Sequence, residues 1–133
     1  MKVPNWPRVL TDEIRRHQNT KFEWGTSDCC MFPADAIKAV TGFDFAEEFR
    51  GKYKTELGSL RALKKYGKGT IEATIDSKYD RNSDTPARGD LATVVTESGT
   101  SLAVVGAGCV WVMTLEGVDS LPLSEVNVSW RVE

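Results

Sequence analysis

Residues 22–32 read Phe-Glu-Trp-Gly-Thr-Ser-Asp-Cys-Cys-Met-Phe, and an apolar pattern of helical spacing follows them. A cysteine directly behind an aspartate, at the start of a helix, is a typical place for a thiol nucleophile, because the positive end of the helix favours the thiolate. Such a thiol works with an imidazole that takes and returns the proton. The chain has one histidine, His17, and it precedes the cysteines. The segment therefore presents half of a cysteine-hydrolase site, with Cys29 as the candidate nucleophile.

The sequence on either side of these cysteines predicts two longer helices. Pro7 opens a helix that runs to about residue 18. Its inner side carries Val9, Leu10 and Ile14, with His17 as a further candidate. Ser27 or Asp28 caps a second helix that runs to about residue 40. Pro33 fits that helix only if it lies within the first turn, where no hydrogen bond from its nitrogen is needed.

Three shorter helical patterns follow. Asp44 and Glu47 have the spacing of a capping box and predict a short helix. Thr55 opens another helix, which Gly67 ends, and its basic residues read as a solvated helix face rather than as a nucleic-acid site. Residues 70–77 predict one more short helix.

After Pro86 the pattern changes from helices to strands. Short valine-rich runs are separated by glycine-containing turns, which is typical of an antiparallel meander. These runs are residues 91–96, 101–105 and 110–115, and residues 121–123 and 126–132 add shorter edge strands. We expect one α+β domain over residues 1–133, helical over about 1–80 and a β meander over about 86–133.

Composition excludes several classes of protein. The 133 residues carry a net charge of −2, so the basic field of a nonspecific nucleic-acid binder is absent. No apolar run reaches the length of a membrane span or of a signal peptide, so we expect neither membrane insertion nor classical export. Three cysteines, two of them adjacent, imply no disulfide framework and fit synthesis in a reducing cytosol.

Three features together resemble the NlpC-type cell-wall peptidases, a compact papain-like family. They are Asp28-Cys29, an aromatic residue at Phe32, and Gly89-Asp90-Leu91 at the start of the first strand. The family pattern is Asp-Cys-Ser-Gly-Phe, then Gly-Asp-Leu, then a strand reading His-Val-Gly-Ile. The resemblance implies a papain-like fold with N-terminal helices packed on a C-terminal antiparallel sheet. It places Cys29 on the nucleophile and Ser101 on the position of the histidine.

The chain is also similar, over nearly its whole length, to small phage and prophage proteins of this superfamily that are often encoded among tail-tip genes. Their five motifs occur here in the same order. They are residues 22–30 with Asp-Cys-Cys, residues 49–53 reading Phe-Arg-Gly-Lys-Tyr, residues 89–91, residues 121–123 reading Leu-Pro-Leu, and residues 130–132 reading Trp-Arg-Val. Pro33 departs from the alanine that is usual in that group.

The proton-transfer half of a peptidase site is missing from this sequence. Amide hydrolysis must protonate the departing amine, and no histidine follows Cys29. Ser101 has too high a pKa for this role, and the next strand offers only Thr114 as a polar residue to orient a base. We interpret His17 as a helix-end or surface residue, because a cation there complements the helix dipole, rather than as a catalytic base. Cys29 is therefore a vestigial nucleophile position.

The remaining polar and aromatic candidates have structural interpretations. We expect Asp28 to cap the helix, Cys30 to point away from the site into the core, and Cys109 to be a strand residue. Adjacent cysteines lack zinc spacing, so we expect no metal and no cofactor. Arg50 and Trp130 are possible interface anchors, since both residue types are enriched at binding hot spots. Trp24, Phe45, Phe49 and Tyr53 are expected to pack in the core.

The resemblance leads to three hypotheses of different classes. The first is a virion structural component of a phage tail tip or baseplate, made in the host cytoplasm, with a degenerate cysteine peptidase fold that binds other tail-tip or hub proteins. The second is an active cysteine peptidase or amidase that cleaves peptidoglycan stem peptides during phage entry. There Cys29 is the nucleophile, and water, a carboxylate or a partner chain supplies the base. The third and weakest is a cytosolic thiol-dependent hydrolase unrelated to phage.

Overall fold

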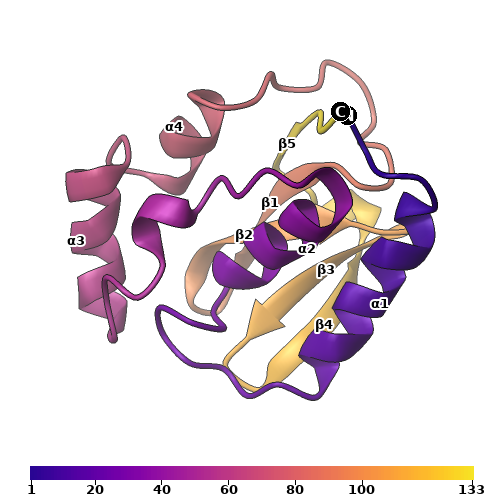
Figure 1. Cartoon of the computed structure of the whole chain (residues 1–133). Coiled ribbons are helices and arrows are strands. Elements are labelled where there is room, and N and C mark those ends of the chain that lie inside the picture. Colours follow the sequence, from indigo (N-terminus) through magenta and orange to yellow (C-terminus); the bar gives the residue numbers. More distant parts are fainter.

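A computed structural model describes residues 1–133 and has an α+β architecture (Figure 1). The helices come first in the chain, and the strands follow. The helices are α1 (Trp6–Gln18), α2 (Met31–Thr41), α3 (Glu56–Tyr66) and α4 (Ile71–Asp76), with a 3₁₀ turn η1 (Glu47–Phe49) between α2 and α3. No helix has the length and apolar character that crossing a bilayer requires.

The strands form one five-stranded sheet in which every neighbouring pair is antiparallel. They are β1 (Leu91–Thr96), β2 (Gly99–Val105), β3 (Cys109–Thr114), β4 (Gly117–Pro122) and β5 (Val128–Trp130), with a 3₁₀ turn η2 (Leu123–Glu125) before β5. The order across the sheet is β4-β3-β2-β1-β5. The first four strands are a simple meander, and the chain then returns to place β5 beside β1.

The helix α2 is buried on nearly all sides. Met31, Phe32, Ala34, Ala36, Ile37 and Val40 are fully buried in the main core. In Figure 1 the helix lies against the sheet, with α1 packed beside it. Burial of one large apolar side chain contributes about 1.5–3 kcal/mol, so this helix holds the two layers of the domain together.

A second, smaller core lies between the side chains of strands β1 to β3 and the segment around η2. It consists of short residues of β1, β2 and β3, against which Leu121, Leu123 and Val126 pack. The strand residues are Ala92, Val94, Ala103, Val105, Val110 and Val112. The segment that carries the chain from β4 to the opposite edge of the sheet therefore also closes this core.

The helix boundaries agree with the sequence except near the cysteines and Asp44. Thr55 and Thr70 cap α3 and α4 with their side chains, as expected. The α2 helix begins only at Met31, which places Pro33 in its first turn. The capping box at Asp44 was wrong. The Asp44 carboxylate instead binds the guanidinium of Arg50 at 2.6 Å and the backbone N–H of Ala46 at 3.1 Å.

The interpretation of His17 as a surface residue was also wrong. Its side chain is 2% exposed, with Nε2 3.0 Å from Oδ2 of Asp35 and the ring edge-to-face with Phe32 at 5.1 Å. The reason is its position on α1. His17 follows Leu10 and Ile14 at helical spacing, so it continues the buried stripe of this helix.

Arg50 and Trp130 are structural residues rather than free anchors. Trp130 is 0% exposed, and its Nε1 donates to Oδ1 of Asp76 at 2.9 Å. Arg50 pairs with Asp44 and, at 2.8 Å, with Oδ1 of Asp35. Asp35 thus links His17 on α1 to Arg50 after η1, and this network joins three elements.

Acid should weaken this network through Asp35. Burial raises the pKa of Asp35, but the hydrogen bond from His17 and the charges of Arg50 and His17 hold it below its ordinary value. A carboxylate with a depressed pKa in the folded state adds stability above its unfolded pKa of about 3.9 and loses it as pH falls through the folded value.

We therefore expect Asp35→Asn to lower the free energy of unfolding near pH 7 by about 1–3 kcal/mol and to flatten its decline below about pH 4. Denaturant unfolding at a series of pH values measures both effects. Asp84→Asn, at an exposed aspartate with no ion pair, is the matched control. Parallel pH profiles for the wild type and Asp35→Asn would contradict this role.

Candidate functional site

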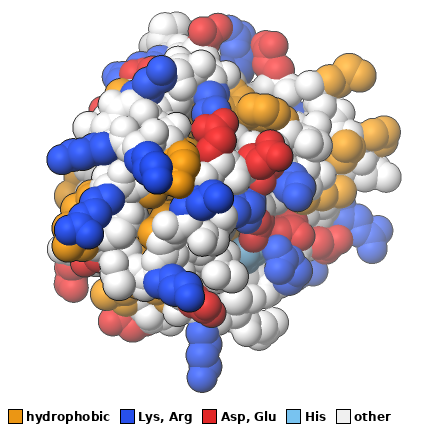
Figure 2. All heavy atoms as spheres, turned by 60° about the vertical axis from the view of Figure 1, so that its left-hand side comes forward, with side chains coloured by type: hydrophobic (Ala, Val, Ile, Leu, Met, Phe, Trp, Pro, Cys, Tyr) orange, Lys and Arg blue, Asp and Glu red, His pale blue; other side chains and the backbone are white.

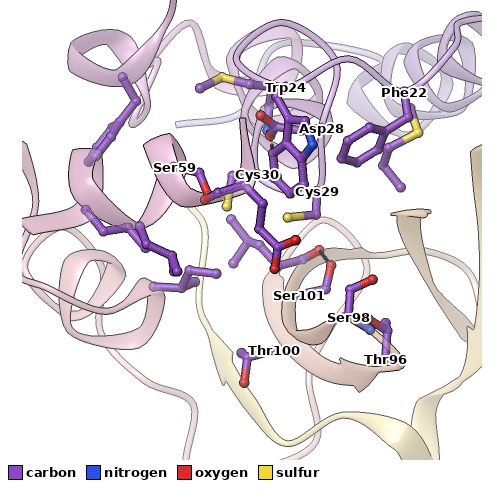
Figure 3. A pocket seen from close by; sticks show the side chains of 18 of the residues that line it. Phe22, Trp24, Asp28, Cys29, Cys30, Ser59, Thr96, Ser98, Thr100 and Ser101 are labelled. Carbon is purple, nitrogen blue, oxygen red and sulfur yellow. Dashed lines mark hydrogen bonds between the residues drawn. The ribbon is translucent and has the colours of Figure 1, made fainter. Parts of the chain in front are cut away.

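A cavity of about 470 Å³ lies beside the N-terminal end of α2 (Figure 3). The segment from Phe22 to Met31, the turns β1–β2 and β3–β4, and residues of α3 and α4 surround it. Most of the lining residues are hydrophobic, including Phe22, Trp24, Phe49, Leu60 and Leu63. Cys29, Cys30 and Ser101 of β2 lie in its wall, and Figure 3 shows Ser101 beside Cys29.

Asp28 fixes the backbone from which the two cysteines extend. Its side chain is fully buried. One carboxylate oxygen accepts from the N–H of Cys30 at 3.0 Å and of Met31 at 2.9 Å. The other accepts from the N–H of Gly25 at 2.8 Å and from the hydroxyl of Tyr53 at 2.5 Å. The capping role expected for Asp28 is therefore confirmed, and the cap also binds two other segments.

Gly25 allows these segments to approach each other. Its φ is +84°, and a Cβ at this position would lie 2.1 Å from the carbonyl oxygen of Tyr53. Only glycine fits such a contact with a positive φ. The neighbouring Trp24 packs edge-to-face on Phe22 at 4.8 Å, and both rings line the cavity. The Trp-Gly pair thus forms part of the cavity wall and lets Asp28 reach Tyr53.

The two thiols interact with each other. The Cys30 thiol donates a hydrogen bond to the Cys29 sulfur, which lowers the pKa of Cys29, while burial and the charge of Asp28 act in the opposite direction. The same hydrogen bond, together with burial, raises the pKa of Cys30 well above its ordinary value. Cys29 is consequently the thiol that ionises first, and Cys30 remains protonated.

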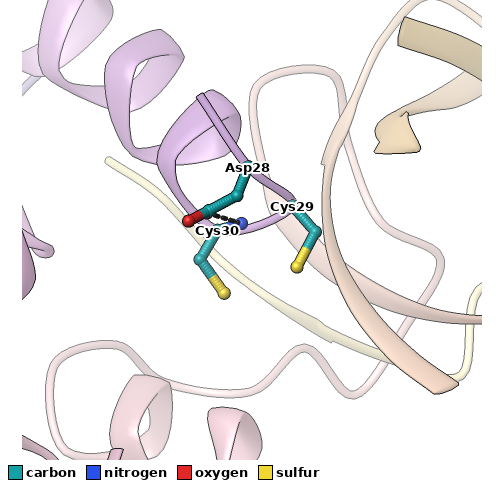
Figure 4. A group of neighbouring side chains, drawn as sticks. All are labelled: Asp28, Cys29 and Cys30. Atoms are coloured by element: carbon teal, nitrogen blue, oxygen red, sulfur yellow. Dashed lines mark hydrogen bonds between the residues drawn. The ribbon is translucent and has the colours of Figure 1, made fainter. Parts of the chain in front are cut away.

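Cys30 packs against the main core, as expected, but it does not point away from the site. Cys30 is only partly buried and lines the cavity with Cys29. Figure 4 shows both side chains extending to the same side of the turn. The physical reason is that the regular helix begins at Met31. Cys29 and Cys30 lie in the turn before it, which Phe32 closes by donating its N–H to the carbonyl oxygen of Asp28 at 3.1 Å.

Ser101 lies beside Cys29 in the cavity wall. It is buried on β2, and its hydroxyl is 3.1 Å from the carbonyl oxygen of Leu102. A hydrogen bond from this hydroxyl to Cys29 also lowers the pKa of the thiol. The structure thus brings both candidate site residues together. A serine hydroxyl can polarise the thiol but cannot take up its proton at neutral pH.

No basic side chain lines the cavity. His17 belongs to the network with Asp35 on α1 and is absent from the cavity wall, where neither lysine nor arginine occurs. The ionisable groups of the wall, besides Asp28, the thiols and Tyr53, are Glu56, Glu97 and Glu116. The site can therefore form a thiolate, but it offers no imidazole to protonate a leaving amine.

The donor atoms do not build a metal centre. The side chains of Asp28, Cys29 and Cys30 offer ligand atoms within 4.8 Å of one another. However, the Asp28 carboxylate already accepts four hydrogen bonds. Two adjacent sulfurs remain, fewer than the three or four protein ligands of zinc sites.

The sequence did not predict the role of Tyr53. We expected it to pack in the core, and it does, but its hydroxyl also donates to Asp28. Burial and the charge of Asp28 raise the pKa of Tyr53 far above its ordinary value, so the phenol keeps its proton. The only sequence signal was the motif of residues 49–53, which does not reveal the partner.

We expect Tyr53→Phe to lower the free energy of unfolding by about 1.5–3 kcal/mol, because a buried carboxylate loses a charge-assisted hydrogen bond. The freed carboxylate should also repel a Cys29 thiolate more strongly and slow its alkylation by iodoacetamide near pH 7. Tyr66→Phe removes a hydroxyl with no hydrogen bond and serves as the control. Equal stability of the two variants would show that the Asp28–Tyr53 contact contributes nothing.

Comparison with known proteins identifies a family without identifying an activity. A family model described as Domain of unknown function (DUF6950) matches residues 1–132. A search of curated proteins finds no match. Since the match covers nearly the whole chain, this protein belongs to the DUF6950 family.

Proposed function

We propose that the chain is a structural component of a phage tail tip or baseplate, built on a papain-like, NlpC-type fold whose peptidase site has lost its acid–base half. The observation that carries the proposal is that Ser101, and no histidine, lines the cavity with Cys29. In the NlpC-type pattern an imidazole stands at the position of Ser101, whereas here the partner of the thiol is a hydroxyl. No other lining residue replaces the imidazole.

The order of the elements supports the papain-like part of the proposal. A cysteine precedes a buried helix, and the helix packs on an antiparallel sheet whose second strand carries the partner residue. The Gly-Asp-Leu motif opens β1. The Asp90 carboxylate there accepts from the N–H groups of Ala87 and Val132. This motif is therefore structural and would persist without catalysis.

The absence of a base supports the scaffold over the enzyme, because the contribution of such a group to the rate is large. A positioned acid–base group contributes about 10²–10⁴-fold to the rate of such reactions. The hydrogen bonds that lower the pKa of Cys29 favour attack on a substrate but do nothing for the departing amine. The scaffold function therefore fits the site better than amide hydrolysis does.

Docking on hub or neighbouring tail proteins has two candidate surfaces. The β4 strand is an edge of the sheet, next to α1. Helix α3 carries Leu57, which is 57% exposed, and Leu60, which is 52% exposed and also lines the cavity. Figure 2 shows basic and acidic side chains interspersed on the face that includes α3, so no single sign of charge directs a partner such as nucleic acid there.

One observation favours a second candidate, an active cysteine peptidase or amidase that cleaves peptidoglycan stem peptides during phage entry. The cavity is large enough for a short peptide, and the pKa of Cys29 is lowered. A carboxylate of the wall, such as Glu56 or Glu97, or a partner chain would then supply the base. This candidate requires turnover that depends on Cys29.

In a phage that carries this gene, deletion should prevent assembly of complete tails, whereas Cys29→Ala should leave tails and infectivity normal. Electron microscopy of lysates and plaque counts measure these outcomes. A scaffold needs the fold but not the thiol, so the point variant is the matched control for the deletion.

The purified protein should release no peptide from bacterial cell walls. If it does release peptide, and Cys29→Ala abolishes the release, the peptidase candidate replaces the scaffold. Normal tails after gene deletion would reject the scaffold independently of any enzymatic assay.

A further inference from the structure

The cavity wall contains a pair of thiols that neither candidate function uses as a pair. Cys29 and Cys30 are consecutive, both are partly exposed, and both line the cavity (Figure 4). Their sulfur atoms lie within 4.8 Å of each other. A peptidase site needs one nucleophilic thiol, and a scaffold needs none.

We propose that Cys29 and Cys30 are a redox-active pair that a hydroperoxide converts into a disulfide between adjacent residues. In the first step the Cys29 thiolate attacks the peroxide, whose O–O bond breaks. Cys29 becomes a sulfenic acid by taking one oxygen of the peroxide with its hydrogen. The rest of the oxidant leaves as an alkoxide, which then takes a proton from water, or as hydroxide when the oxidant is hydrogen peroxide. In the second step the Cys30 sulfur attacks the Cys29 sulfur, and the S–O bond breaks. The Cys30 proton leaves with the hydroxyl group as water.

The two thiols are suited to different steps. Oxidation begins at the sulfur with more thiolate character and with access to solvent. The hydrogen bonds from Cys30 and Ser101 favour the thiolate of Cys29, and the cavity admits a small oxidant. Cys30 keeps its proton and stands within reach of the oxidised sulfur, which is the position of a resolving cysteine.

The geometry makes the resulting bond reversible. Consecutive Cα atoms across a trans peptide are about 3.8 Å apart, and most disulfides join Cα atoms separated by about 4.4–6.8 Å. A bond between Cys29 and Cys30 is therefore strained, and strained disulfides are readily reduced by thiols. Such a bond protects Cys29 from irreversible oxidation until a reductant restores the thiols.

Oxidation should also destabilise the backbone at the start of α2. The N–H groups of Cys30 and Met31 donate to Asp28, so the backbone of the turn is held in one conformation. Closing a ring between the two side chains changes this backbone and weakens these hydrogen bonds. The oxidised chain should therefore melt at a lower temperature than the reduced chain, and reduction should restore the melting temperature.

The experiment treats the reduced, full-length protein with hydrogen peroxide and follows the intact mass and the proteolytic peptides. We expect the monomer to lose two hydrogen atoms, the loss to map to the peptide that contains residues 29 and 30, and dithiothreitol to reverse it. Cys30→Ala and Cys30→Ser should abolish this species. Cys29 should then be trapped by dimedone as a sulfenic acid and continue to the sulfinic and sulfonic acids.

Cys109→Ala is the matched control, because it removes the third thiol and leaves the pair intact. This variant should form the disulfide as the wild type does. Accumulation of sulfinic acid at Cys29 in the wild type, or a disulfide that involves Cys109, would overturn the proposal. The wild-type mapping decides the question even if a Cys30 variant fails to fold. Since it does not depend on peptide release or tail assembly, its outcome is separate from that of the proposed function.

Discussion

The structure depends on one buried carboxylate. Asp28 has no cation beside it, and its charge is balanced by three backbone N–H groups and the hydroxyl of Tyr53. These donors come from the turn at Gly25, from the start of α2 and from the loop after η1. A buried carboxylate with fewer donors would cost several kcal/mol, so the three segments and the side chain hold one another in place. The position of Cys29 follows from this arrangement.

This dependence explains how a thiol can remain in place without a catalytic partner. In a working cysteine hydrolase the thiolate is paired with a charged imidazole, whereas here its stabilising contacts come from a second thiol and a serine hydroxyl. The capping aspartate acts on the backbone rather than on the sulfur. Residue 101 is free to change without disturbing that cap, while residue 28 is not. On the proposed scaffold function, the part of the site that is kept is the part that the fold itself requires.

The sequence predicted elements whose signals are local. Thr55 and Thr70 mark helix starts because a side-chain cap acts within one turn, and valine-rich runs between glycines mark strands. Contacts between distant segments were not predictable. The pairing of β5 with β1, the contact of His17 with Asp35 and the hydrogen bond of Tyr53 to Asp28 each join residues far apart in sequence. For the candidate site, the sequence indicated Cys29 and Ser101, but the direction of Cys30 depended on where the regular helix begins.

The cavity wall also contains an optical reporter. Trp24 lines the cavity in the segment that leads to Cys29, and its ring rests on that of Phe22. The emission wavelength of an indole depends on the polarity around the ring. A molecule that displaces water from the cavity therefore shifts the emission maximum of Trp24. The other three tryptophans, Trp6, Trp111 and Trp130, do not line this cavity and provide the background emission. A fluorimeter can therefore register occupancy of the cavity without any attached dye.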